Sequence, residues 1–199
     1  MENRYELLKQ IKEDIINLKS SPLYEVRIKN KVFPVIGEGN HEAEVMFIGE
    51  GPGKNEAATG KPFCGAAGSV LTELIESIGL KREDVYITNI VKDRPPDNRD
   101  PLPEEIKIYA PFLDRQIEII QPKIIATLGR YSMAYIMQKF GLFNELKSIS
   151  QIHGKVFDTK ASYGEVKVVP LYHPAVALYQ NSLKAQMFED FKVIKKYNE

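Results

Sequence analysis

The stretch FIGEGPGKNE, residues 47–56, joins a short apolar run to a loop that holds three glycines, a proline and a lysine. The apolar run EVMFIG (44–49) is stopped abruptly by glycine, which is typical of a strand buried inside a sheet. Such an exit can be a phosphate-cradling loop, a dinucleotide-binding turn, a rigid corner that grips another ligand, or a strand exit with no ligand.

The usual phosphate-binding patterns fit this loop poorly. A Walker loop needs glycine, four residues and then Gly-Lys-Ser/Thr. Counting back from Gly53 places Ile48 where the first glycine belongs, and Asn55 stands where the magnesium-binding hydroxyl belongs. A dinucleotide turn needs Gly-x-Gly-x-x-Gly leading directly into a helix. The glycines here recur at every second position, and we expect the next helix only at 66–80.

The rest of the chain alternates between strand and helix patterns. Strands are expected at 44–49, 84–91, 123–129 and 165–173, and helices at 4–18, 66–80, 103–122, 130–140 and 183–197. The segment 20–43 has little periodicity, so we expect it to cross the surface in extended form, and we expect Pro111 to kink or divide its helix. The alternation predicts an α/β fold with right-handed crossovers and helices on both faces of a mainly parallel sheet.

Length and composition limit the possibilities. A chain of 199 residues with 43% hydrophobic content fits a single domain, 1–199, around one sizeable core. The 27 basic and 27 acidic residues exclude a protein that coats nucleic acid through net charge, although a locally basic groove is compatible with them. The single cysteine, Cys64, excludes an internal disulfide and a zinc or iron–sulfur site built from cysteines.

The same features predict a cytoplasmic, nucleoid-associated protein of prokaryotic type. A lone cysteine favours a reducing compartment. The first 18 residues alternate charged and apolar side chains at helical spacing, which is not the pattern of a signal peptide. No apolar stretch approaches the roughly 18 residues of a membrane span, so we expect no membrane partner.

Ligands of parallel α/β sheets bind beyond the carboxyl ends of the strands. Here those ends carry residues 49–51, Asn89, Gly129 and His173. The role of Asn89 is either structural or functional, because a buried amide needs partners and also offers the donor–acceptor pair that reads an imide edge. A lone histidine is more often structural, but His173 is expected to face the same crevice as Glu50 and Asn89, which favours function.

Two loops beside this edge are open to two interpretations each. Phe63, in the sequence TGKPFCGAAG, is either a core plug or a platform on which a planar ring stacks. The loop TNIVKDRPPDNRDP carries Lys92, Arg94 and Arg99, which are either solvated surface cations or contacts to phosphates.

Taken together, these segments resemble the uracil-DNA glycosylases of family 4, the thermostable bacterial and archaeal type. The resemblance covers about residues 20–180 and is carried, in order, by GEGN (37–40), IGEGPGKNE, GKPFCGAAG, YITNIVKDRPPDNRDPLPEE, LDRQIEIIQPKIIATLG and LYHPA. It implies a three-layer α/β/α fold around a central four-stranded parallel sheet. It also implies hydrolysis of the N-glycosidic bond of deoxyuridine in single- and double-stranded DNA, which releases uracil and leaves an abasic site.

The resemblance assigns roles that suit the chemistry of each residue. Phe63 would stack on the flipped uracil. Asn89 would accept from N3–H and donate to O4, which distinguishes uracil from cytosine. His173 would donate to O2, where negative charge grows as the bond breaks. The GEGPG corner would activate water and bring the backbone of Gly49 to Gly51 against the base and sugar, an approach that a side chain would block.

The roles of two acidic residues are less sharply defined. Some related glycosylases have an aspartate at the third position of the GEGPG corner, where this chain has Gly51. We expect Glu50 to assist the water and Glu56 to lie near uracil C5, where a methyl group would clash, but the two assignments can be exchanged. In the loop after His173, Leu178 is the expected wedge into the duplex, with Tyr179 beside it.

The chain departs from the family at one set of positions. Family 4 enzymes carry a [4Fe–4S] cluster on four cysteines, and the matching positions here read Leu18, Ser21, Asp93 and Tyr109. We therefore predict no metal site and no cofactor, and Cys64 belongs to a different motif. Packing of Leu18 and Tyr109, together with an ion pair of Asp93, is expected to replace the cluster.

Rival functions remain. A non-catalytic DNA-binding module could keep the fold, although Glu50, Phe63, Asn89 and His173 favour an enzyme. A nucleotide-binding domain fails on both phosphate patterns, and the loop VKDRPPDNRD lacks the histidine of a related variant that forms a covalent adduct. The expected partner is uracil-containing DNA. Extrusion of the base is least costly from single strands and mispairs. No convincing peptide for binding a sliding clamp is present, and the resemblance implies a monomer.

Overall fold

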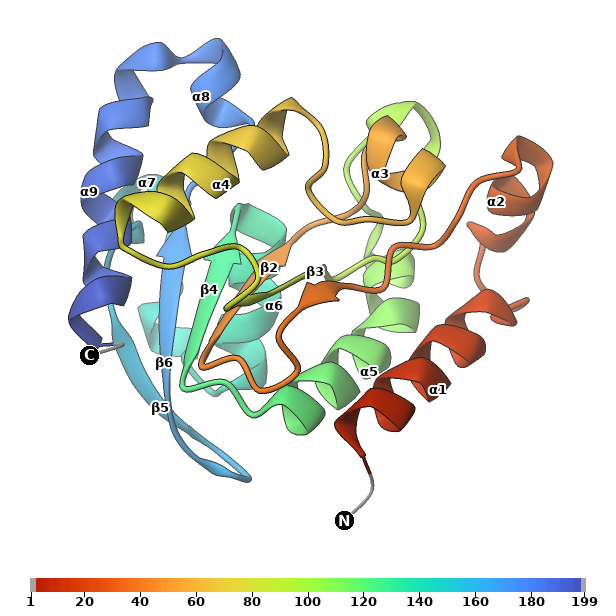
Figure 1. Cartoon of the computed structure of the whole chain (residues 1–199), viewed down its shortest axis with the longest axis horizontal. Helices are drawn as coiled ribbons and strands as arrows, with labels where there is room; N and C mark the ends of the chain where they lie inside the picture. Colours follow the sequence, from red (N-terminus) through yellow and green to blue (C-terminus); the bar gives the residue numbers. More distant parts are fainter. Residues whose placement is uncertain (1–2, 198–199) are drawn as a thin grey trace.

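A computed structural model describes residues 3–197, and a six-stranded sheet in the order β1-β3-β2-β4-β6-β5 lies at its centre (Figure 1). The four inner strands run parallel to one another: β3 (Tyr86–Asn89), β2 (Val45–Gly49), β4 (Ile124–Leu128) and β6 (Gly164–Leu171). Short antiparallel strands close both edges, β1 (Glu38–Gly39) and β5 (Phe157–Ala161). The expected central four-stranded parallel sheet is therefore confirmed, and the two edge strands are additions to it.

Helices cover both faces of the sheet, as Figure 1 shows. On one face lie α1 (Arg4–Ile16), α5 (Pro103–Ile120) and α6 (Arg130–Lys139), and on the other α4 (Ala66–Ser77) and α9 (Asn181–Tyr197). Because side chains alternate along a strand, β2 serves both layers. Met46 and Ile48 pack under the first set of helices, and Val45 and Phe47 under the second. This explains why β2 reads as one continuous apolar run.

Of the short helices that the sequence did not predict, two change an expectation stated above. The first, α2 (Tyr24–Asn30), lies inside the segment 20–43, so the extended crossing expected there is wrong over this part. The second, α3 (Lys54–Thr59), begins directly after Gly53. The glycine loop therefore does lead into a helix, and only its glycine spacing still argues against a dinucleotide turn. In addition, α5 continues through Pro111 as one helix, with the proline on its exposed side.

The remaining short elements are η1 (Pro96–Asn98), η2 (Phe143–Glu145), α7 (Ile149–Ile152) and α8 (Val176–Tyr179). Among the helices of residues 3–197, none is long and apolar enough to cross a membrane.

The parallel register brings the carboxyl ends of the inner strands to one edge of the sheet. Gly49 at the end of β2 is paired with Asn89 at the end of β3, and Leu128 on β4 is paired with Leu171 on β6. His173 follows β6 by two residues. Residues from four distant parts of the sequence therefore meet at a single edge, where ligands of such sheets bind.

Candidate active site

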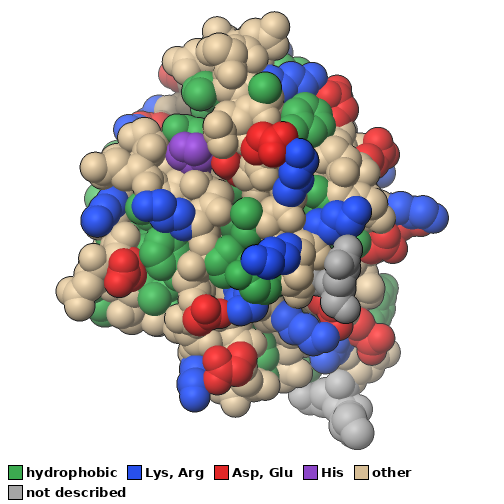
Figure 2. Space-filling view, turned by 90° about the vertical axis from the view of Figure 1, so that its left-hand side faces the viewer, with side chains coloured by type: hydrophobic (Ala, Val, Ile, Leu, Met, Phe, Trp, Pro, Cys, Tyr) green, Lys and Arg blue, Asp and Glu red, His purple; other side chains and the backbone are tan. Residues whose placement is uncertain are grey.

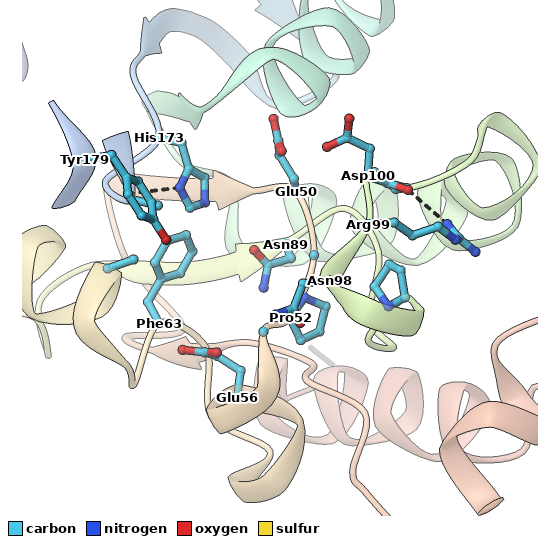
Figure 3. Close-up of a pocket in the computed structure, with 16 residues that line it drawn as sticks. Glu50, Pro52, Glu56, Phe63, Asn89, Asn98, Arg99, Asp100, His173 and Tyr179 are labelled. Carbon is cyan, nitrogen blue, oxygen red and sulfur yellow. Dashed lines mark hydrogen bonds between the residues drawn. The ribbon is translucent and has the colours of Figure 1, made fainter. Parts of the chain in front are cut away.

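A pocket of about 390 Å³ opens at this edge (Figure 3). Several residues singled out in the sequence contribute to its lining: Glu50, Gly51, Glu56, Phe63, Asn89, His173, Arg99 and Tyr179. They come from the end of β3, from α3 and α8, and from the loops that follow β2, β3 and β6 or precede α4. The structure thus brings together most of the expected site.

Asn89 forms the floor of the pocket. Its side chain is 1% exposed, and its Oδ1 atom has no hydrogen-bond partner among the described residues. A buried acceptor left unpaired costs roughly 1–3 kcal/mol. Because Asn89 lines the pocket, an N–H group of a bound ligand could supply the missing partner.

Gly49 makes room for the side chains around Asn89. A Cβ atom on Gly49 would lie 2.3 Å from Asn89 Oδ1 and 2.7 Å from the ring of Phe63. Gly51 is less restricted, because the nearest atom to a Cβ there, on Val91, would be 3.7 Å away. Of these two glycines in the corner, only Gly49 is therefore demanded by packing inside the protein itself.

Phe63 lies both in the core and at the pocket, and its use as a stacking platform stays a prediction. Its ring packs in the core beneath α4 and also lines the pocket. Its backbone is left-handed, with φ at 47°, and a Cβ on Gly68 would lie 1.8 Å from its carbonyl oxygen. The ring centroid lies 5.6 Å from that of His173, with the planes tilted by 32°. The two rings form adjacent walls of the pocket.

Glu56 holds the loop that carries Phe63. Its Oε1 atom accepts hydrogen bonds from the backbone N–H groups of Cys64 and Gly65, both at 2.9 Å. These groups precede α4, so the carboxylate also faces the positive end of that helix dipole. Glu56 lines the pocket and at the same time fixes the position of its aromatic wall.

His173 is set up as a neutral hydrogen-bond donor. Its Nδ1 atom accepts from the backbone N–H of Ala175 at 3.2 Å, which places the single proton of the neutral ring on Nε2. Burial lowers the pKa of His173 to about 4, although the nearby Glu56 opposes this. At neutral pH the ring is therefore uncharged and presents Nε2–H.

Glu50 follows β2, and in Figure 3 Asn89 lies between it and Glu56. Glu50 Oε1 accepts from the backbone N–H of Tyr131 at 3.0 Å, in the first turn of α6. A Cβ on Gly129 would lie 2.5 Å from Oε1, so this approach requires glycine. Burial raises the pKa of Glu50, even though the bond to Tyr131 favours the charged form.

A second set of polar residues beside Glu50 was missed in the sequence. Asp100 lines the pocket and accepts hydrogen bonds from the side chains of Tyr131 and Arg130. Asp100 also contributes to raising the pKa of Glu50. The sequence does contain a signal for these residues, because Arg130 and Tyr131 directly follow Gly129 at the end of a predicted strand.

The prediction that Lys92 contacts DNA is wrong. Its side chain is 0% exposed, and its Nζ atom bonds to Thr88, Asn89 and Gln116 inside the protein. The sequence suggested a surface loop after β3, but Val91 and Lys92 still belong to the buried end of this strand region.

Arg94 and Arg99 stay predicted phosphate contacts. Arg94 donates through Nε to Asn98 Oδ1 at 2.6 Å. Arg99 pairs with both carboxylate oxygens of Glu105, at 2.5 and 2.9 Å. The charge of Arg99 is therefore partly compensated before any ligand binds.

Charged side chains of both signs are interspersed on the face of the molecule in Figure 2. This agrees with the equal numbers of basic and acidic residues in the chain.

The segment α8 carries two exposed apolar side chains beside the pocket. Leu178 is 47% exposed and Tyr179 is 86% exposed, and Tyr179 also lines the pocket. Their use as a wedge into DNA stays a prediction.

The four positions expected for an iron–sulfur cluster hold a different structure. Asp93 accepts two hydrogen bonds from Arg27, at 2.9 and 3.0 Å, and one from Tyr109 Oη at 2.5 Å. Tyr109 Oη also lies 2.7 Å from Ser21 Oγ. Leu18 packs against the core of the same layer. The expected ion pair of Asp93 is thus confirmed, with Arg27 as a partner that the sequence did not reveal.

These residues do not fit a cluster, because they offer no thiolate and their own hydrogen bonds and packing occupy the space between them. In residues 3–197 no group of three or more His, Cys, Asp or Glu side chains is arranged to hold a metal ion. Arg27 also donates to the carbonyl oxygens of Ile15 and Ile16 at the end of α1. The network therefore ties α1 and α2 to the loop that follows β3.

Comparison with known proteins extends these observations. The family model described as the uracil DNA glycosylase superfamily matches residues 36–195. The type-4 uracil-DNA glycosylase of Sulfurisphaera tokodaii is 49% identical over 94% of this chain and 83% of its own length. The corresponding enzyme of Archaeoglobus fulgidus is 45% identical over 95% and 92%, and that of Thermotoga maritima 39% identical over 99% and 97%. The residues that line the pocket all lie within the range that the family model matches.

Proposed function

This chain belongs to the uracil-DNA glycosylase superfamily and, within it, to the type-4 enzymes, and from this we propose how its pocket acts. We propose that it hydrolyses the N-glycosidic bond of deoxyuridine in single- and double-stranded DNA, releasing uracil and leaving an abasic site. The observation that carries the proposal is the buried Oδ1 of Asn89, which has no partner within residues 3–197 and lies in a pocket also lined by Phe63 and His173.

Uracil supplies what this pocket lacks. Its N3–H group would donate to Asn89 Oδ1, and its O4 atom would accept from the Asn89 amide NH₂ group. Cytosine presents the reverse pattern at both atoms, so both bonds would become repulsive contacts. The ring of Phe63 offers a face on which the flipped base stacks. Glu56, beside Phe63, would occupy the space that a 5-methyl group of thymine needs.

Bond cleavage requires charge stabilisation at the base and a nucleophile at the sugar. As the bond between N1 and C1′ breaks, its electron pair moves into the uracil ring and charge grows on O2. The neutral His173 would donate Nε2–H to O2, a bond that strengthens in the transition state. Water then attacks C1′ and loses a proton to Glu50. The uracil anion takes up a proton from solvent and Glu50 later releases its proton, so that the products are uracil and an abasic sugar.

The geometry favours Glu50 over Glu56 as the residue that assists the water. Glu50 lines the pocket, and within the described residues its carboxylate accepts one hydrogen bond, at Oε1 from the backbone N–H of Tyr131. Glu56 already accepts two backbone N–H groups, which hold its carboxylate against the loop of Phe63. Such a bonded carboxylate is better suited to shape the pocket than to take a proton.

DNA would approach the open side of the pocket. We infer that Leu178 and Tyr179 enter the stack at the site of the extruded base, since both are exposed beside the pocket. Arg94 and Arg99 would contact phosphates on the loop side. The whole chain, 1–199, would act as one domain, because a single sheet joins elements from both halves of the sequence.

We also propose that this enzyme works without an iron–sulfur cluster. The network of Arg27, Asp93, Tyr109 and Ser21 would hold α1 and α2 in place instead. Glycosidic hydrolysis has no redox step, so the chemistry makes no demand on a cluster. Iron and sulfide analysis of protein purified without oxygen tests this point, and stoichiometric iron would overturn it.

The activity is tested with an end-labelled single-stranded oligonucleotide that holds one uracil, treated with alkali after incubation. Cleavage at uracil is expected with the wild-type protein, but not with Asn89→Ala or with a thymine-containing strand. Thr127→Val is a matched control, since Thr127 is equally buried and its hydroxyl has no hydrogen-bond partner among the described residues. Tight binding of uracil-DNA without cleavage would instead identify a non-catalytic DNA-binding module.

A further inference from the structure

Lys92 is a completely buried lysine behind the pocket floor. Its Nζ atom lies 2.6 Å from the carbonyl oxygen of Asn89, 2.7 Å from Thr88 Oγ1 and 2.5 Å from Gln116 Oε1. The carbonyl of Lys92 itself accepts from the backbone N–H of Val35 at 2.8 Å. The residue is therefore held both by its backbone carbonyl and by the end of its side chain.

The surroundings of Lys92 identify its protonation state. The carbonyl oxygen of Ile36 can only accept, so the Thr88 hydroxyl at 2.6 Å and the Gln116 Nε2 group at 2.9 Å both donate to it. Thr88 Oγ1 and Gln116 Oε1 consequently turn lone pairs toward Lys92, as does the Asn89 carbonyl. The carbonyl oxygen of Ile36, 3.4 Å from Nζ, is a fourth and more distant acceptor. Three close acceptors around one nitrogen are matched by three N–H donors, which only the ammonium form of the lysine has.

This ammonium group is not explained by stability. Among residues 3–197 no carboxylate forms an ion pair with Lys92, and burial lowers its pKa well below the usual range. Burying a charge that is compensated only by dipoles is costly, and an apolar side chain could fill the space without that cost. A costly charge kept against the floor of a binding pocket points to a role in the pocket.

We propose that Lys92 is a positioning residue whose buried ammonium fixes the peptide carbonyl of Asn89 and so holds the uracil-reading amide in place. The proposal rests on the proposed function and deepens it. β3 ends at Asn89, so the strand ladder alone does not hold the carbonyl of this residue. A misplacement of about 1 Å can cost roughly 100-fold in rate, which makes such an anchor valuable.

The charge of Lys92 adds a second effect. When the glycosidic bond breaks, the departing base takes the electron pair and becomes anionic. A fixed positive charge in the protein interior behind Asn89 stabilises this anion more than the neutral substrate. Lys92 would therefore raise the rate of the chemical step with no contact to DNA.

The test is Lys92→Met, which keeps the length of the side chain and removes its charge and donors. Single-turnover rates are measured over a range of enzyme concentrations, so that the maximal rate and the half-saturating concentration are obtained separately. We expect the maximal rate to fall roughly 10- to 100-fold, with the half-saturating concentration unchanged. Thr127→Val, on β4, which is separated from β3 by β2, is expected to match the wild-type protein in both.

A folded Lys92→Met protein with a maximal rate like that of the wild type would overturn the role of Lys92 alone. A wild-type protein that leaves uracil-DNA intact would overturn the proposed function, and this proposal with it. The two failures are therefore distinguishable.

A second measurement does not depend on the variant folding. Wild-type protein with ¹⁵N-labelled lysine side chains is observed by NMR at neutral pH. We expect one slowly exchanging ammonium signal, since Lys92 is the buried lysine of the described residues, and we expect it to shift when free uracil is added. A neutral amine, or a signal that uracil leaves unmoved, would overturn the proposal.

Discussion

The side chain of Asn89 occupies the space that any side chain on Gly49 would need, since a Cβ atom on Gly49 would lie 2.3 Å from Asn89 Oδ1. Gly49→Ala is therefore expected to displace Asn89 and Phe63, to lower the free energy of unfolding by about 1–3 kcal/mol and to abolish uracil excision. Urea unfolding and single-turnover kinetics check this. Gly51→Ala should leave the stability unchanged, and equal losses of stability in both variants would contradict the argument.

Replacing Asn89 by leucine should separate stability from activity. The change removes a buried acceptor that has no partner among the described residues and keeps the branched shape of the side chain, so the free energy of unfolding is expected to stay level or to rise by about 1 kcal/mol. Uracil excision should fall at least about 100-fold, because the amide is the group that would bind the base. A clear loss of stability would show that Asn89 has structural partners in the protein.

Glu50 should control the acid side of the pH–rate profile. Burial raises its pKa above that of an ordinary glutamate, and only the carboxylate can take the proton of water. The single-turnover rate is therefore expected to fall as the pH drops through this raised pKa.

Glu50→Gln should lower the rate roughly 100-fold or more and flatten the acid limb. Glu56→Gln should keep the limb, whatever its effect on the rate. If the limb disappears with Glu56→Gln and persists with Glu50→Gln, the two assignments must be exchanged.

His173 should make the protein less stable in acid. Its pKa is about 4 in the folded protein against 6.5 for an unperturbed histidine, so the unfolded chain binds the extra proton first. The stability from the neutral ring is complete above about pH 6.5 and is lost as the pH falls toward about 4, by about 3 kcal/mol at most. Unfolding of the wild type and of His173→Gln across this range gives the difference. A gap between them that stays constant with pH would contradict the assignment.

The pair of Arg27 and Asp93 should behave as a buried unit. Its side chains are only 4% and 2% exposed, so removing one partner leaves the other charge uncompensated. Arg27→Met and Asp93→Asn are each expected to cost about 3 kcal/mol in the free energy of unfolding, and the double variant less than their sum. Asp14→Asn, which breaks the exposed pair with Arg115, should cost less than about 1 kcal/mol. Strict additivity would argue against the network.

The sequence was sufficient for the sheet because each inner strand is an apolar run with a clear end. It was also sufficient to gather Glu50, Phe63, Asn89 and His173, since parallel strands bring their carboxyl ends together. The sequence did not predict α2, because its residues YEVRIKN lack apolar periodicity. This helix is held instead by tertiary contacts of Arg27. Local pattern carries no information on such contacts.

The burial of Lys92 and of Arg27 could not be predicted from the sequence, for one common reason. A cation in a polar loop is usually solvated. The residues next to Lys92 in the sequence give no indication that Gln116, 24 residues away, supplies an acceptor for it. Arg27 likewise meets Asp93 across 66 residues of sequence. Both are buried by acceptors that only the folded chain brings together.

If the enzyme works without an iron–sulfur cluster, as proposed, the network around Asp93 changes what the cell must provide for it. A segment held by arginine, aspartate, tyrosine and serine would be complete as soon as the chain has folded, and it would need neither iron nor the machinery that assembles clusters. It also offers nothing for superoxide or peroxide to dismantle. Under the proposed function, a cell in which oxidants damage DNA would thus keep this repair activity during the same chemical stress.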